Sequence, residues 1–165
     1  GLPVAVLIDG RSASGAEVVA AAMQDSGRAV LIGATTFGKG SVQTVTPLPN
    51  DGELYLTWSR IYAPSGYTLH RQGVLPTICT SGATGNADEL IAAYRAGGLV
   101  PIALLNTARQ AAPDDLAALE QLRGTCPWQA HDEALDELIA RRVLLDAALY
   151  AEALAGVGQL AQASR

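Results

Sequence analysis

The stretch PVAVLIDGRSASGAEVVAAAMQDSGRAVLIG, residues 3–33, decides the fold class of this chain. Pro3–Asp9 is a compact apolar run of the kind found in buried parallel strands. The alanine-rich segment Ser14–Ser26 predicts a helix, and Gly27 provides its C-terminal stop. Arg28–Gly33 predicts a second short strand. The order strand, helix, strand predicts a βαβ unit and therefore an α/β fold.

The hydrophobic pattern changes after residue 40. Two strands are expected over Ser41–Leu48 and Glu53–Tyr62, because Pro49-Asn50-Asp51-Gly52 between them is a strong hairpin signal. After a small-residue linker the rest of the chain is alanine-rich and helical. The expected helices are Asp88–Ala96, Ile102–Gln110, Asp114–Arg123 and His131–Leu154. We therefore expect an α/β part over residues 1–78 and a helical C-terminal region over residues 79–165.

Composition limits the class of protein. Of the 165 residues, 49% are hydrophobic and 16% are charged, which favours a globular chain over a disordered one. The net charge of −5 and the scattered basic residues argue against a nucleic-acid surface. No apolar run approaches the roughly 18 to 20 residues of a membrane span. Two cysteines, Cys79 and Cys126, permit at most one internal disulfide, and two buried thiols are the alternative.

Ser14 stands where the first strand runs into the predicted helix. Ser14 and Glu17 fit a capping box, which is a purely structural interpretation. A serine at a helix N-terminus also lies among unpaired N–H groups, which can stabilise a developing oxyanion. Gly15 leaves its own N–H accessible to a substrate carbonyl. Ser12 could cap the helix equally well, so the residues alone leave both serines open as nucleophiles.

Lys39 is the only lysine in the chain. The loop Gly33–Gly40 matches a nucleotide-binding Walker A pattern at every position except the last. Gly40 stands where a hydroxyl should bind Mg²⁺, and a strand follows instead of a helix, so nucleotide binding is disfavoured. A lysine can act as a general base when desolvation favours its neutral form. Gln43 could accept a hydrogen bond from the Lys39 amine, or it could be an ordinary exposed strand residue.

Several motifs, in order and at the right separations, resemble one protein family. These motifs are Asp9–Glu17, Ala22–Val30, Thr36–Gln43, Tyr62–Gly66 and Gly73–Pro76. Together they resemble the carboxy-terminal processing (tail-specific) serine proteases over about residues 3 to 78. The resemblance implies a partial ClpP/crotonase-like ββα core, followed here by the α-helical C-terminal region.

The resemblance also assigns roles to particular residues. It implies that Ser14, rather than Ser12, is the nucleophile and that Lys39 is the general base. It implies that Gln43 orients Lys39 and that the N–H of Gly15 is one oxyanion donor. Most members of the family have alanine at the position of Gly15, so this residue is a departure. No metal or cofactor is implied.

The family further implies a setting for the protein. Its members act outside the cytoplasm or in the thylakoid lumen, on protein substrates with an exposed C-terminus. We expect the bacterial periplasm, and this location favours a disulfide between Cys79 and Cys126. The acidic composition and the lack of a long apolar run make nucleic-acid partners and a transmembrane segment unexpected in this chain.

The family pattern also implies parts that the 165 residues do not contain. Family members carry a PDZ domain and further core strands upstream, including a second oxyanion donor. We therefore expect this chain alone to be a poor protease, and an open strand edge near Leu2 predicts self-association. The alternatives are a non-catalytic peptide- or ligand-binding module of the same fold, or a crotonase-like acyl-CoA enzyme. The acyl-CoA enzyme is disfavoured because it gives Lys39 no role.

Overall fold

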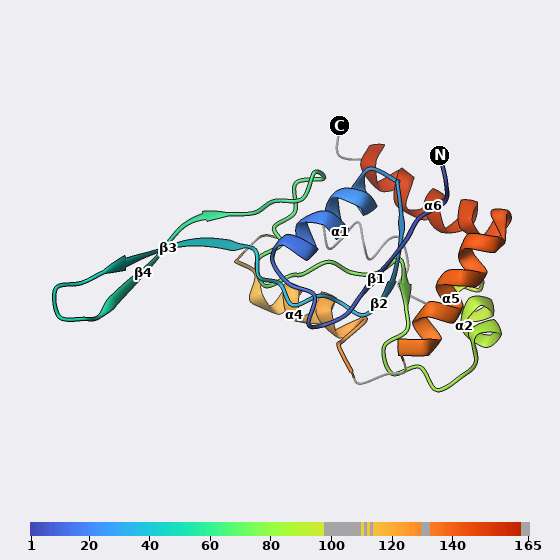
Figure 1. Ribbon diagram of the computed structural model, residues 1–165. Helices are drawn as coiled ribbons and strands as arrows, with labels where there is room; N and C mark the ends of the chain where they lie inside the picture. Colours follow the sequence, from blue (N-terminus) through green and yellow to red (C-terminus); the bar gives the residue numbers. More distant parts are fainter. Residues whose placement is uncertain (98–109, 111, 113, 130–132, 163–165) are drawn as a thin grey trace.

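A three-stranded parallel sheet forms the centre of the molecule in the computed structural model, which describes residues 1–97, 110, 112, 114–129 and 133–162 (Figure 1). The strand order is β1 (Ala5–Ile8), β2 (Val30–Gly33) and β5 (Ile78–Cys79). Helix α1 (Gly15–Asp25) connects β1 to β2, which pair in parallel from Ala5 opposite Val30. The predicted βαβ unit is therefore confirmed.

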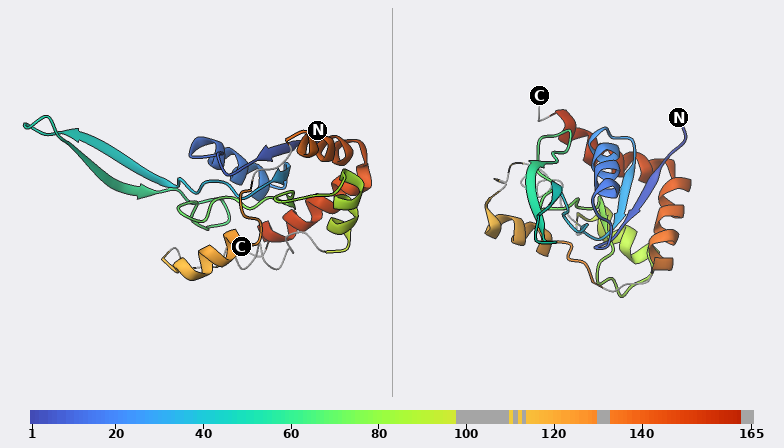
Figure 2. Two further views of the ribbon diagram at one scale, coloured as in Figure 1. Left: turned by 90° about the horizontal axis from the view of Figure 1, so that it is seen from below. Right: turned by 60° about the vertical axis from the view of Figure 1, so that its left-hand side comes forward.

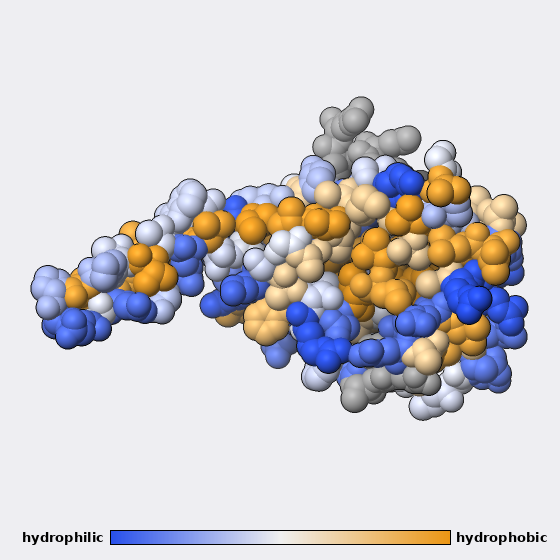
Figure 3. Space-filling model, viewed as in Figure 1, coloured by the Kyte–Doolittle hydropathy of each residue, from blue (hydrophilic) through white to orange (hydrophobic). Residues whose placement is uncertain are grey.

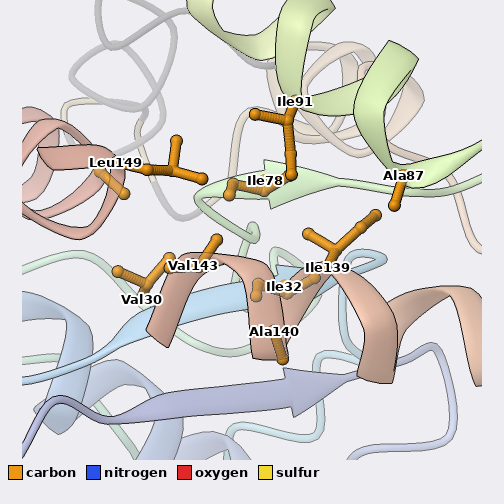
Figure 4. Close-up of a cluster of buried hydrophobic side chains, with 10 residues drawn as sticks. Val30, Ile32, Ile78, Ala87, Ile91, Ile139, Ala140, Val143 and Leu149 are labelled. Atoms are coloured by element: carbon orange, nitrogen blue, oxygen red, sulfur yellow. The ribbon is translucent and has the colours of Figure 1, made fainter. Parts of the chain in front are cut away.

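The two faces of the sheet are covered by different parts of the chain. On one face Leu31 packs with alanines of α1 and with the segment that follows the hairpin. On the other face Val30 and Ile32 pack against α2 (Ala87–Arg95), α5 (Glu133–Leu145) and α6 (Ala147–Gln162) (Figure 4). Side chains of a strand alternate between its faces, so β2 supplies both clusters. The burial of each large aliphatic side chain contributes about 1.5–3 kcal/mol.

Within the described residues, the helices near the C-terminus are divided differently from those expected. The structure has two helices, α5 and α6, where one was expected over His131–Leu154. The division falls at Asp146, whose Oδ1 accepts hydrogen bonds from the N–H groups of Ala148 and Leu149, at 3.0 Å each. An aspartate that caps a new helix in this way competes with continuation of the old one. The single-helix prediction was therefore wrong.

Two other predicted helices have different outcomes. Helix α4 (Leu116–Gly124) lies where Asp114–Arg123 was expected, with Asp115 as its N-cap. Nearly all of the predicted helix Ile102–Gln110 lies outside the described residues, as does His131.

Replacement of Asp146 by alanine should lower the free energy of unfolding by about 1 kcal/mol, because the first N–H groups of α6 lose their acceptor. Chemical denaturation of the two proteins measures the difference. Asp146→Asn is the matched control, since it keeps a capping oxygen and removes only the charge. An equal loss in both variants would show that the ion pair with Arg95, rather than the cap, is what matters.

A long antiparallel hairpin projects from the body of the molecule (Figures 1 and 2). It consists of β3 (Ser41–Pro47) and β4 (Glu53–Arg60), with an irregularity in register between Val42 and Gln43. This confirms the predicted hairpin. Much of its hydrophobic surface is exposed, including Tyr55 and Trp58, and Figure 3 shows hydrophobic residues along it.

Strand β5 was not expected from the sequence. The boundary expected between residues 78 and 79 falls inside this strand, and the cluster around Ile78 takes side chains from both sides of the boundary. Within the described residues, every helix falls short of the length and hydropathy that crossing a membrane would require.

Candidate active site

The backbone of Ser14 has an unusual conformation at the turn between β1 and α1. Its φ is 56° and its ψ is −118°, values that a residue with a side chain rarely adopts. Such a conformation costs on the order of 1–3 kcal/mol and is found mainly at functional sites. A strained turn between strand and helix is also the setting that exposes the nucleophilic serine of the α/β-hydrolases.

Glu17 joins Ser14 to the loop that carries Lys39, residues 37–40, which we call the lysine loop. Its side chain is completely buried. Oε2 accepts the backbone N–H groups of both Ser14 and Lys39, each at 2.8 Å. Oε1 accepts the N–H of Gly38 at 2.6 Å and the hydroxyl of Thr36. The two segments singled out from the sequence therefore meet at one carboxylate.

Ser12, the alternative nucleophile, lies in the turn that precedes Ser14. Its hydroxyl donates to Oδ1 of Asp9 and accepts the N–H of Asp9. Burial raises the pKa of Asp9, but hydrogen bonds from Arg11 and Ser12 outweigh this effect and leave the pKa below its usual value. The carbonyl of Ser12 also accepts the N–H of Phe37 at 3.0 Å. Ser12 thus helps to build the turn and ties it to the lysine loop.

The side chains of Lys39 and Gln43 are both exposed. Nε2 of Gln43 donates to Oγ1 of Thr57 on the neighbouring strand of the hairpin, at 2.9 Å. The structure therefore brings the backbones of Ser14 and Lys39 together. The side-chain amide of Gln43 instead forms a hydrogen bond within the hairpin, to Thr57 of β4. The roles expected for Ser14, Lys39 and Gln43 remain predictions.

Gly15, the expected oxyanion donor, is the first residue of α1. In the part of the chain that the structure describes, its N–H has no hydrogen-bond acceptor. A Cβ atom at this position would have no other atom within 4 Å, so alanine fits here without a clash. The N–H that the oxyanion role needs is present in both residues.

We expect Gly15→Ala to raise the free energy of unfolding by about 0.5–1 kcal/mol, because alanine loses less backbone entropy in a helix. Thermal or chemical denaturation measures this. Gly27→Ala is the matched control, since Gly27 has a φ of 63° and alanine there should destabilise the protein. Destabilisation by Gly15→Ala would mean that the turn needs glycine at this position.

Two further residues of the site could not be recognised from the sequence. Thr36 accepts the N–H of Val74 and donates to Glu17, so its hydroxyl serves two segments at once. Arg123, on α4, donates through Nη1 to the carbonyl oxygen of Thr36 at 2.9 Å. Thr36 lies inside a motif, but its contact with Arg123 spans a sequence separation of 87, which no local pattern can show.

Cys79 and Cys126 form a disulfide that closes a separation of 47 residues. This agrees with the predicted pairing. The bond joins the end of β5 to the segment just after α4. The carbonyl of Cys126 also accepts the N–H of Thr35, at 3.1 Å, so the same segment contacts the residues between β2 and the lysine loop.

A cleft of about 250 Å³ lies between the end of β1, the turn that follows it and the start of α5. Its lining residues are Leu7, Ile8, Asp9, Ser12, Glu133, Asp136 and Glu137. Ser14 and Lys39 are not among them, so this cleft is distinct from the surroundings of the expected nucleophile. Within the described residues, no group of three or more histidine, cysteine, aspartate or glutamate side chains is arranged to hold a metal ion.

The family model for peptidase family S41 matches residues 1–80 of the chain. The predicted resemblance is confirmed. A carboxy-terminal-processing protease of Bartonella bacilliformis is 51% identical over 76 residues, which are 46% of this chain and 18% of that protein. Carboxyl-terminal-processing peptidase 3, chloroplastic, of Arabidopsis thaliana is 40% identical over 91 residues, covering 54% of this chain and 17% of that protein.

A solved structure, the photosystem II D1 C-terminal processing protease, is also similar to this chain. It is 39% identical, with a TM-score of 0.42, and the match covers 45% of this chain and 19% of that one. The chain thus spans less than a fifth of the length of these similar proteins. Arg123 and the rest of α4 lie beyond the residues that the family model matches.

Proposed function

We propose that this chain contains the C-terminal part of the catalytic domain of a serine endopeptidase in which Ser14 is the nucleophile and Lys39 the general base. The observation that carries the proposal is the shared carboxylate oxygen of Glu17, which lies 2.8 Å from the backbone nitrogens of both residues. The strained backbone of Ser14 supports the same assignment. The hydroxyl of Ser12 is engaged by Asp9, which favours Ser14 over Ser12.

The proposed reaction is acyl transfer in two steps. Lys39 accepts the proton of Ser14 Oγ while this oxygen bonds to the scissile carbonyl carbon. The negative charge that develops on the carbonyl oxygen faces the N–H of Gly15. The C–N bond then breaks, and Lys39 gives its proton to the leaving amine. Water attacks the acyl-enzyme by the same route and releases Ser14. In this scheme Gln43 orients the amine of Lys39.

The wider setting is part of the proposal. The protein would cleave other proteins near an exposed C-terminus, in line with the names of the carboxy-terminal-processing relatives, and it would do so outside the cytoplasm. The sheet with helices on both faces would be part of a ClpP/crotonase-like core. Upstream segments, including a PDZ domain, would complete the substrate site, so the 165-residue chain alone would hydrolyse peptides poorly.

A serine-directed fluorophosphonate tests the chemistry without requiring a complete substrate site. We expect the probe to label Ser14, and we expect labelling to fall by about a hundredfold or more in Lys39→Ala, since a general base contributes about 10²–10⁴-fold. Ser12→Ala is the matched control and should still be labelled. Labelling that persists in Ser14→Ala would overturn the assignment. Binding of a peptide without any labelling would instead favour the non-catalytic binding module.

A further inference from the structure

Arg123 is a half-buried cation beside the proposed site, and the mechanism described so far does not use it. Its Nη1 donates to three backbone carbonyl oxygens: Thr36 at 2.9 Å, Gln72 at 3.1 Å and Arg71 at 3.4 Å. Two of these carbonyls belong to the segment after the hairpin, and the third belongs to the segment between β2 and Lys39. One guanidinium nitrogen therefore holds two chain segments together.

Both of these segments are linked by hydrogen bonds to the lysine loop, Arg71 directly and Thr36 through Glu17. The N–H of Arg71 donates to the carbonyl of Gly38, the residue before Lys39, at 2.9 Å. Thr36 donates its hydroxyl to Glu17, which in turn accepts the N–H of Lys39. A movement of the Thr36 carbonyl or of Arg71 would therefore displace the backbone that carries the lysine.

The motif that contains Gly73 makes room for this contact. Gly73 has a φ of 72°, and a Cβ there would lie 2.5 Å from the carbonyl oxygen of Thr36 and 3.1 Å from Nη1 of Arg123. A side chain at this position would push apart the same groups that Arg123 joins. The glycine therefore permits the close approach on which the contact depends.

The guanidinium is placed by the disulfide and by α4. Arg123 is in the last turn of α4, three residues before Cys126, whose sulfur is bonded to Cys79. Burial lowers the pKa of Arg123, while the negative charge of Glu17 opposes that change. The site thus receives one fixed positive charge from a region beyond the residues matched by the family model.

We propose that Arg123 is a positioning residue for Lys39. Through Arg123, the helical C-terminal region would help to hold the backbone of the active site in place. The proposal rests on the proposed function for its catalytic consequence, but the placement of the lysine loop can be tested without any activity. The guanidinium acts through the backbones of Thr36 and Arg71 and does not touch substrate.

Amide hydrogen exchange of the 165-residue chain tests the placement directly. In Arg123→Met we expect the amides of Gly38 and Lys39 to exchange about tenfold faster or more, because the segments that hold them lose shared hydrogen bonds. The amides of Leu31 and Ile32 in the central strand should not change. Arg142→Met is the matched control, since Arg142 makes an exposed ion pair with Asp88 and is remote from the loop.

The rate of fluorophosphonate labelling tests the catalytic consequence. Arg123→Met should label Ser14 about tenfold more slowly at a temperature at which every variant is folded, and Arg123→Lys should recover part of the rate. A merely stabilising arginine would change the denaturation midpoint and leave both loop exchange and labelling as in the parent, which would overturn the proposal. If the parent chain is not labelled, the proposed function fails, whereas the exchange data still decide whether Arg123 places the loop.

Discussion

Replacement of Glu17 by alanine is expected to lower the free energy of unfolding by about 4 kcal/mol and to abolish fluorophosphonate labelling. The carboxylate is completely buried and accepts four hydrogen bonds, from the backbones of Ser14, Gly38 and Lys39 and from the hydroxyl of Thr36. Without it, the buried Gly38 N–H and Thr36 hydroxyl and the part-buried N–H groups of Ser14 and Lys39 lose their acceptor, and an unsatisfied buried group costs about 1–3 kcal/mol. The two proposed catalytic segments would also lose their common contact.

Chemical denaturation and labelling of the same samples measure both effects. Glu89→Ala is a close control, because Glu89 is the equivalent capping-box glutamate of α2 but is exposed. It should cost less than about 1 kcal/mol. Similar losses in the two variants would mean that Glu17 is only a helix cap. A stable Glu17→Ala protein that is labelled normally would contradict the role of the carboxylate in joining Ser14 to Lys39.

Loss of the Cys79–Cys126 disulfide is expected to lower the free energy of unfolding by about 4 kcal/mol. The bond closes a separation of 47 residues, and in the chain-entropy model this restricts the unfolded chain by about that amount. Both cysteines are buried beside Ala34 and Leu75, so the double variant Cys79→Ala/Cys126→Ala keeps an apolar environment. Denaturation with and without a reductant measures the effect.

The control for the disulfide is built into the same experiment. A reductant should destabilise the parent protein and should leave the double variant unchanged. The amide of Thr35, which donates to the carbonyl of Cys126, should exchange faster in both reduced and substituted proteins. A parent protein whose stability does not respond to complete reduction would contradict the prediction.

Local patterns were sufficient for most secondary structure. The apolar runs around β1 and β2, the alanine-rich α1 and the hairpin turn were each readable because the signal lies within a few neighbouring residues. The same patterns failed at Asp146, where a polar residue inside a long helical pattern starts a new helix instead of continuing the old one. Strand β5 has only two residues, too few for any periodicity to show.

The chain's own motifs were enough to establish an α/β fold, a resemblance to processing proteases and a short set of candidate residues, since these features depend on near neighbours. Tertiary structure alone decided that Glu17 is a buried junction between Ser14 and Lys39, and that Arg123 reaches the carbonyl of Thr36. The reason is physical. A buried carboxylate or guanidinium forms hydrogen bonds with the backbone groups that folding brings within about 3 Å. Every residue has these backbone groups, so the sequence does not show which of them will become the partners.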